Sequence, residues 1–274
     1  MVACGSLAGC GMAGVPAHTS AAPSPPAQTA TVRSPHVDAR PSCYGQSRSA
    51  TCRVLFIGNS YTYVNDLPGM FARLAEASHR TVETDALAEA GETLADHAAT
   101  SETDATLSGN GWNVVVLQEQ SATPLLAADR QLKMYSAARL LVSTIRAVGA
   151  RPVFFVTPAY RDGLRQYGFS DYAAMQAAID KAYLSIAQEL KVTVAPVGDA
   201  WSAASHKSAD TTLWQADGSH PTVQGTYLDA CVFYATLFHQ SPIGLAFRAG
   251  LPRGTARRLQ IIAADVVAHN HAPA

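Results

Sequence analysis

The sequence lacks several features that would each point to a particular class of protein. After the first residues, no apolar run approaches the ~20 residues that a membrane-spanning helix needs, so we expect no transmembrane helix in the body of the chain. The formal net charge is only −1, from 20 Lys and Arg against 21 Asp and Glu, so no bulk field attracts nucleic acid. The 9 histidines form no His-Glu-x-x-His motif and no cluster with cysteine, which argues against a metal site.

Residues 1–50 also lack the periodic apolar pattern of a folded domain. The chain over 13–42 is mainly Ala, Pro, Ser and Thr, which cannot bury enough apolar area to offset the entropy lost on ordering. We therefore predict a disordered tether here and a single globular domain over 51–274.

A short motif precedes this tether. Leu7-Ala8-Gly9-Cys10 resembles a bacterial lipobox, in which the cysteine is acylated and becomes the new N-terminus. A lipid on Cys10 would anchor an exported protein at the cell surface or in the periplasm. The segment before Cys10 contains no Lys or Arg and is short for a signal peptide, so a secretory remnant followed by a linker is the alternative.

The 5 cysteines fit an exported protein. Cys43 and Cys52 bracket a short polar segment just before the first predicted strand, and we expect a disulfide between them outside the cytosol. Cys231 lies in an apolar helical stretch, where a cysteine acts as a small buried hydrophobe.

From residue 53 onward, strand and helix patterns alternate. The runs 113–118 and 152–157 are continuously apolar, as in strands that are covered on both faces of a parallel sheet. We therefore predict an α/β fold, a three-layer α/β/α sandwich around a five-stranded parallel sheet. The predicted strands are 53–58, 82–88, 113–118, 152–157 and 192–197, and the predicted helices are 67–79, 93–106, 127–148, 170–190, 221–239 and 252–268.

The first of these strands ends at Gly58-Asn59-Ser60. Because ligands bind beyond the carboxyl ends of the strands in open α/β sheets, Ser60 is a candidate nucleophile. The alternative is that Ser60 has only a structural role, as the cap of the next segment or in a hydrogen bond within a turn. A serine is a weak nucleophile and needs a base.

The segment Asp217-Gly218-Ser219-His220-Pro221 supplies the candidate base and its acid. Pro221 suits a first helical turn, which predicts His220 at or near the N-cap of the helix that follows. Across the turn, the carboxylate of Asp217 can bond one imidazole nitrogen and leave the other for a serine hydroxyl. Alone, this segment would also fit a simple turn and helix cap.

Together, Gly58-Asn59-Ser60 and Asp217 with His220 resemble the SGNH (GDSL-type) hydrolase family, in its exported bacterial esterase branch. The resemblance covers about residues 53–239, with Asn59 in place of the family's aspartate. It implies a flavodoxin-like fold, Ser60, Asp217 and His220 as catalytic residues, and no cofactor.

The resemblance also implies an oxyanion hole made by the amide of Ser60, a glycine amide after the second strand and an asparagine side chain after the third. Gly91 stands at the glycine position, and Gln120 stands at the asparagine position. The alternatives are that Gln118 donates instead or that the site has no third donor. The implied reaction is hydrolysis of a carboxylic ester through an acyl-enzyme.

For the substrate, we expect a small-molecule or glycan ester, with short acyl groups such as O-acetyl groups on carbohydrates. The alternatives are a lipase or thioesterase of the same family, and an exported glycan-binding protein that has lost activity. Five aromatic residues near the predicted site are candidates for stacking on sugar rings: Tyr61, Tyr63, Tyr160, Trp201 and Trp214. The alternative is that the tyrosines at the strand ends only pack against the protein.

Overall fold

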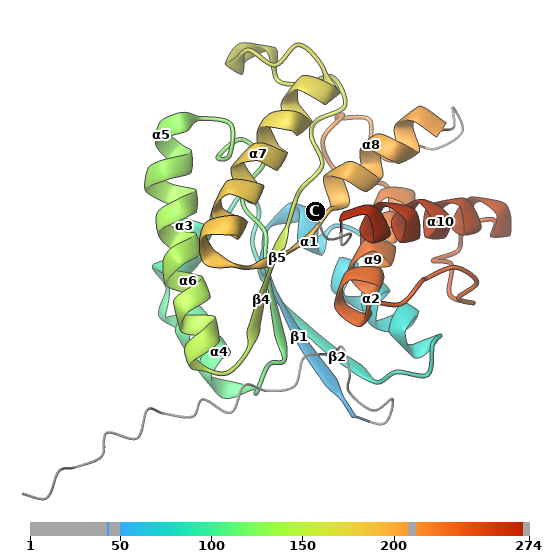
Figure 1. The fold of residues 1–274 in the computed structure, drawn as a ribbon, viewed down its shortest axis with the longest axis horizontal. Helices are drawn as coiled ribbons and strands as arrows, with labels where there is room; N and C mark the ends of the chain where they lie inside the picture. The colour runs from blue at the N-terminus through green and yellow to red at the C-terminus, as the bar shows by residue number, and fades with distance from the viewer. Residues whose placement is uncertain (1–42, 44–49, 208–211, 271–274) are drawn as a thin grey trace, which may run out of the picture. The chain divides into compact units, whose positions relative to one another are not determined.

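The computed structural model describes Cys43, residues 50–207 and residues 212–270. The predicted lipidation site Cys10 and the predicted tether lie outside these residues. In the described part, the fold is the predicted one, with helices on both faces of a five-stranded, fully parallel sheet in the order β2-β1-β3-β4-β5 (Figure 1). The strands are β1 (Cys52–Gly58), β2 (Val82–Ala88), β3 (Val114–Leu117), β4 (Arg151–Phe155) and β5 (Thr193–Ala195).

The first strand is the central element because both of its faces are buried. Val54 and Phe56 point into one hydrophobic cluster, and Leu55 and Ile57 point into the other. This alternation follows from the two-residue period of a strand. All four side chains have no exposed surface, which explains why the strand reads as a continuous apolar run.

Two sets of helices cover the sheet (Figure 1). One face is covered by α2 (Leu67–Glu76), α8 (Val197–Lys207) and α9 (Val223–Phe238), and α10 (Arg253–Asn270) packs on α8 and α9. On the other face lie α3 (Leu94–Ala98), α4 (Ser101–Gly109), α5 (Ala127–Asp129), the π-helical turn η1 (Arg130–Tyr135), α6 (Ser136–Ala147) and α7 (Tyr172–Leu190). Two short helices remain, α1 (Ser60–Tyr63) and the 3-10 turn η2 (Arg165–Tyr167).

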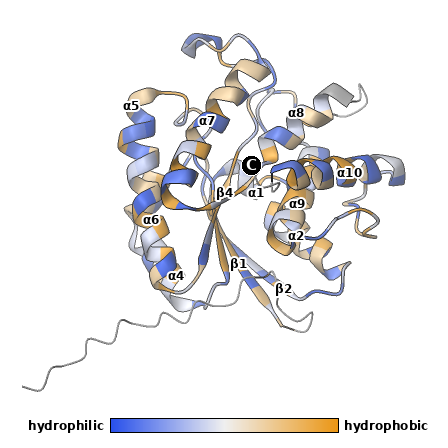
Figure 2. Ribbon diagram, in the orientation of Figure 1, coloured by the Kyte–Doolittle hydropathy of each residue, from blue (hydrophilic) through white to orange (hydrophobic). Residues whose placement is uncertain are grey.

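The helices are amphipathic where they lie at the surface. Along η1 and α6, hydrophilic and hydrophobic residues alternate around the helix (Figure 2). By contrast, α9 is buried along almost its whole length, from Gly225 to Phe238, because the sheet lies on one side and α10 on the other. Cys231 is fully buried in α9 and free, as predicted. Among the described residues, no helix combines the length and the apolar character needed to cross a membrane.

The helix predictions need three corrections. The predicted helix 93–106 is two helices, α3 and α4, because Thr100 caps a new helix by accepting a hydrogen bond from the N–H of Thr103. Helix α8 was not predicted from the sequence, although four buried residues recur in it at helical spacing: Val197, Ala200, Trp201 and Ala204. The predicted helix 221–239 begins two residues later, since Thr222 is the N-cap of α9.

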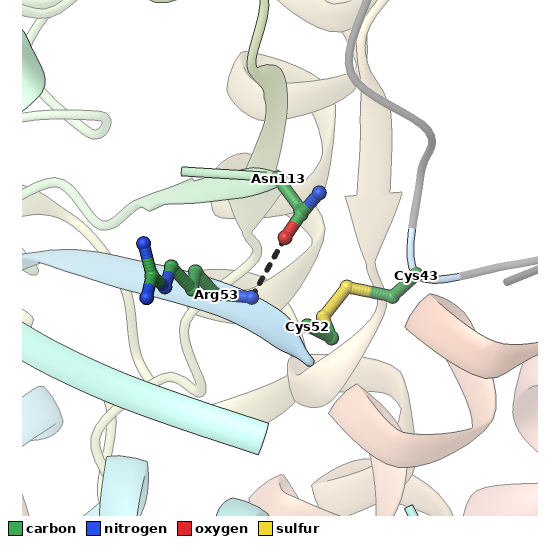
Figure 3. Close-up of a disulfide and its surroundings, with 4 residues drawn as sticks. All are labelled: Cys43, Cys52, Arg53 and Asn113. Carbon is green, nitrogen blue, oxygen red and sulfur yellow. Dashed lines mark hydrogen bonds between the residues drawn. A yellow bond between two sulfur atoms is a disulfide. The ribbon is translucent and has the colours of Figure 1, made fainter. Parts of the chain in front are cut away.

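A disulfide joins Cys43 to Cys52, the first residue of β1 (Figure 3). Both cysteines are buried. Next to Cys52, the N–H of Arg53 donates to Oδ1 of Asn113 at 2.8 Å, so the start of β1 is also tied to the segment that enters β3. These bonds fix the amino end of the central strand.

The packing of α9 on β1 predicts a large cost for removing one aromatic ring. Phe233 is fully buried, and its ring centroid lies 5.4 Å from that of Phe56 and 5.2 Å from that of Phe155. We expect Phe233→Ala to lower the free energy of unfolding by roughly 3–5 kcal/mol in urea titrations. Leu184→Ala on α7, where the side chain is 51% exposed, should cost about 0.5 kcal/mol or less. Equal losses in the two variants would contradict this packing.

Candidate active site

The serine turn follows directly from the end of β1. Asn59 is the N-cap of α1, and its Oδ1 accepts a hydrogen bond from the N–H of Tyr61 at 3.3 Å. This places Ser60 at the first position of the helix, beyond the carboxyl end of the central strand. Ser60 is partly exposed, whereas Asn59 is 2% exposed, so the turn presents its serine to solvent.

His220, which is 160 residues from Ser60 in the sequence, lies next to it in the structure, together with Asp217. Nε2 of His220 lies 3.0 Å from Oγ of Ser60, and Nδ1 lies 2.6 Å from Oδ2 of Asp217. Since an ionised carboxylate can only accept, Nδ1 carries the proton and Nε2 is left to accept the serine proton. The hydrogen bond from His220 also holds the pKa of Asp217 below its usual range, which keeps the carboxylate ionised.

The loop that carries these two residues is fixed by its own backbone. Oδ1 of Asp217 accepts from the N–H groups of Ser219 at 2.9 Å and of His220 at 3.0 Å. The turn requires Gly218, which has φ of 70°. His220 therefore lies in a turn two residues before Thr222, the N-cap of α9, and so near the N-cap as predicted.

Tyr61 supports the loop from the serine side. Its hydroxyl donates to the carbonyl oxygen of Ser219 at 3.0 Å, and its ring lies 6.1 Å from the His220 ring, centroid to centroid. Burial raises the pKa of Tyr61, so the phenol stays a donor. The residue next to the serine thus holds the loop that carries the histidine.

Gln118 supports the serine turn from the end of β3. Its Oε1 accepts from the N–H of Asn59 at 2.9 Å and from the hydroxyl of Thr62 at 3.0 Å, and its Nε2 donates to the carbonyl of Glu119 at 2.9 Å. A Cβ on Gly58 would overlap this amide, which explains the glycine. Because Gln118 is fully buried, it is not available to a substrate, and Gln120 is left as the candidate oxyanion donor.

Gln120 is held in one orientation by its neighbours. Its Oε1 accepts from the N–H of Ala122 at 2.8 Å and of Thr123 at 3.3 Å, so the oxygen must face these two donors. The Nε2 group therefore points to the opposite side, and within the described part of the chain it has no hydrogen-bond partner. The backbone N–H groups of Ser60 and Gly91 likewise donate to no acceptor among the described residues.

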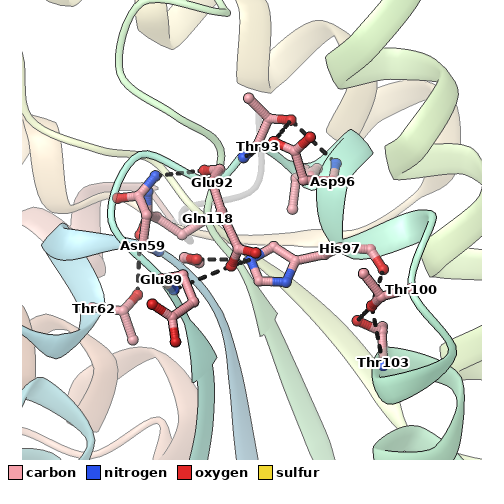
Figure 4. A network of polar contacts seen from close by, with 12 residues as sticks. Asn59, Thr62, Glu89, Glu92, Thr93, Asp96, His97, Thr100, Thr103 and Gln118 are labelled. Carbon is pink, nitrogen blue, oxygen red and sulfur yellow. Dashed lines mark hydrogen bonds and ion pairs between the residues drawn. The ribbon is translucent and has the colours of Figure 1, made fainter.

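The Gly91 loop is joined to the serine turn by a network of polar contacts (Figure 4). Nδ2 of Asn59 donates to the carbonyl of Glu92 at 2.8 Å. Nε2 of His97 lies 2.7 Å from the carbonyl of Gly58, which requires a proton on that nitrogen, and 3.2 Å from Oε2 of Glu92. Gly91 itself is exposed and has φ of 76°. The sequence carried no signal for the roles of Glu92 and His97, since neither belongs to a motif.

The aromatic residues predicted to stack on sugar rings behave differently from one another. Trp201 is fully buried in α8 and donates to Oδ1 of Asp229, and Tyr61 is 2% exposed, so the prediction is wrong for these two. Tyr63 is 44% exposed, and Tyr160 and Trp214 are half-buried. Over residues 50–207 and 212–270, no three His, Cys, Asp or Glu side chains are grouped so as to hold a metal ion.

The comparisons with known proteins agree with this fold. No protein-family model and no curated protein matches the sequence. Among solved structures, a protein from Slackia heliotrinireducens described as an SGNH hydrolase is 30% identical, with a TM-score of 0.58, covering 68% of this chain and 99% of its own. A DUF4886 family protein from Bacteroides uniformis is 19% identical, with a TM-score of 0.70, covering 81% and 96%. A catalytic mutant of Axe2, an acetylxylan esterase from Geobacillus stearothermophilus, is 16% identical, with a TM-score of 0.52, covering 76% and 100%.

The last two similarities, both under 20% identity, establish the fold alone. The first similarity, at 30% identity over nearly the whole of the Slackia protein, also shows the family. The chain belongs to the SGNH hydrolase family and is an ester-cleaving hydrolase.

Glu119, next to Gln120, gives a testable pH dependence of stability. Its Oε1 accepts from the N–H of Gln120 at 2.7 Å, but it is fully buried and its Oε2 has no partner, and burial raises its pKa from 4.5 to about 7. The folded state therefore holds a proton that the unfolded state releases, and stability falls as pH rises from about 4.5 to 7. The loss is roughly 3 kcal/mol.

We expect Glu119→Gln to remove this dependence, because the amide keeps the accepting oxygen and does not titrate. In urea titrations, the free energy of unfolding of the variant, relative to that of the wild type, should be higher at pH 8 than at pH 5 by roughly 3 kcal/mol. Burial also raises the pKa of Asp229, to about 8. Because Asp229 titrates in both proteins, its contribution cancels in the difference between them. Parallel pH profiles would refute the assignment.

Proposed function

We propose that Ser60, His220 and Asp217 are a catalytic triad that hydrolyses carboxylic esters through an acyl-enzyme. The observation that carries this proposal is the pair of contacts at His220, 3.0 Å to Oγ of Ser60 and 2.6 Å to Asp217. These distances lie within hydrogen-bond reach for a nucleophile, its base and an orienting acid.

The reaction then runs in two halves. Nε2 of His220 takes the proton of the Ser60 hydroxyl as Oγ attacks the ester carbonyl, and the same nitrogen gives that proton to the leaving alcohol. In the second half, His220 takes a proton from water, which attacks the acyl carbonyl, and returns it to Oγ as the acid leaves. Asp217 holds the proton on Nδ1 and stabilises the imidazolium cation.

We infer that the oxyanion is held by the N–H groups of Ser60 and Gly91 and by Nε2 of Gln120. All three donors lack a protein acceptor among the described residues, and hydrogen bonds hold the Gln120 side chain and the loop of Gly91 in place. Glutamine donates the same amide hydrogen bond as the family's asparagine, from a chain that is one methylene longer.

We propose short acyl groups, such as acetyl esters on carbohydrates, as the substrate. The side chains of His220 and Asp217 are 36% and 46% exposed, which describes an open site and not a tunnel for a long acyl chain. The fold is shared with Axe2, which is described as acting on acetylated xylooligosaccharides. The polymeric or oligomeric alcohol of such an ester fits an open site, since only its acyl end must reach Ser60.

For location, we propose an exported protein with its catalytic domain over 51–274, preceded by a tether and a lipid anchor on Cys10. The disulfide between Cys43 and Cys52 supports an oxidising compartment. Secretion without the lipid is the alternative, and mass spectrometry of the native N-terminus separates the two.

The triad predicts that Ser60→Ala removes ester hydrolysis. With p-nitrophenyl acetate we expect a loss of ~10⁴-fold or more, and acetate and butyrate esters should be preferred by the wild type over octanoate. Ser170→Ala at an exposed loop position is the control, with wild-type rates expected. Fluorophosphonate should label the wild type and not Ser60→Ala. Absence of label in the wild type would favour the inactive glycan-binding alternative.

The oxyanion role of Gln120 is tested by Gln120→Glu, which keeps the accepting oxygen for Ala122 and loses the donor. We expect kcat to fall ~10²–10³-fold while KM changes little, because the bond forms in the transition state. Gln131→Glu, an exposed position on η1, adds the same charge and should leave kcat unchanged. A rise in KM with unchanged kcat would assign Gln120 to substrate binding instead.

A further inference from the structure

The charges of this protein are unevenly distributed. The whole chain is balanced at −1, yet residues 230–264 contain four arginines and no Asp, Glu or Lys. These residues include the end of α9, the loop that follows it and the first part of α10. The arginines of this segment are Arg248, Arg253, Arg257 and Arg258.

Three of these arginines line a furrow together with Arg73 of α2. The furrow consists of three adjoining depressions of about 310, 250 and 370 Å³. The first two share Arg73 and Phe247, and the last two share Arg248. Arg253 and Arg257 line the far end, and we call this surface the arginine furrow.

The guanidinium groups of the furrow have no anionic partner in the described part of the chain. Arg248, Arg253 and Arg257 are exposed and make no ion pair or side-chain hydrogen bond there, and Arg73 lies 4.5 Å above the ring of Phe247. Three exposed arginines outside the furrow do form ion pairs: Arg53 with Glu83, Arg139 with Glu189 and Arg161 with Asp162.

The start of α10 adds to the positive field. Arg253 is its first residue and its first turn contains no acid, although the N-terminus of a helix favours negative charge. The one acidic residue that lines the furrow, Asp66, caps α2 by accepting from the N–H of Gly69 at 3.0 Å. It lies at the opposite end from Arg253.

The near end of the furrow adjoins the loop that carries His220. Asn65 lines the first depression, and its Nδ2 donates to the carbonyl of Pro221 at 2.9 Å. Val223, the first residue of α9, lines the same depression. The furrow therefore leads from the back of the catalytic loop along α2 to the start of α10.

We propose that the arginine furrow binds a carboxylate-bearing polysaccharide, the polymer that carries the ester cleaved at Ser60. Guanidinium groups bind carboxylates in a bidentate manner, and a row of them fits charges that repeat along a chain. This inference rests on the proposed function, which it narrows to esters on an acidic glycan.

The test separates binding from catalysis. Binding of de-esterified polygalacturonate to the Ser60→Ala protein is measured by calorimetry, with and without Arg248→Gln, Arg253→Gln and Arg257→Gln together. We expect the triple variant to weaken binding by ~10-fold or more and to remove most of its salt dependence. A control triple of equal charge change, Arg139→Gln, Arg146→Gln and Arg151→Gln, should bind as the parent does.

The second arm measures kcat/KM with Ser60 intact. On O-acetylated polygalacturonate, the furrow variant should lose ~10-fold or more, while rates on acetylated xylan and p-nitrophenyl acetate stay unchanged. No binding of polygalacturonate, equal losses in the two triple variants, or preferential binding of polyphosphate or of phosphatidylglycerol vesicles would overturn the proposal. Loss of all ester hydrolysis with binding intact would instead refute the proposed function alone.

Discussion

Hydrogen bonds from the end of β3 to the end of β1 hold the serine turn in place. The amide of Gln118 accepts from the backbone of Asn59 and the hydroxyl of Thr62, and it is itself fixed by Glu119. Because Gln118 is fully buried, breaking these bonds would leave polar groups without partners in a low-dielectric interior. The position of Ser60 is thus set by the core of the sheet and not by a surface loop.

The histidine side of the site is built in the opposite way. Asp217 and His220 lie in a partly exposed turn that is held by its own backbone bonds and by the hydroxyl of Tyr61. A rigid nucleophile and a base on a solvent-facing turn leave the entrance open. This arrangement supports the proposed substrate, an ester on a large alcohol, because the alcohol would extend into solvent.

The sequence predicted the elements whose patterns are local. The apolar run of β1 and the Asp217-x-x-His220 spacing both follow from simple periodicity and turn geometry, and the structure brings Ser60 and His220 to 3.0 Å. The missed helix α8 follows a short edge strand, and its alanines give a weak apolar signal. The choice between Gln118 and Gln120 could not be made from sequence, because two glutamines two residues apart differ only in which one the core buries.

The side chain of Asn59 also links the serine turn to the loop of Gly91. An aspartate there could not donate to the carbonyl of Glu92, whereas the amide does so at 2.8 Å. The serine turn and the Gly91 loop therefore form one preorganised body, and the entropy of aligning their two amides is lost when the chain folds, not when substrate arrives. Substrate binding energy is left for orienting the ester itself.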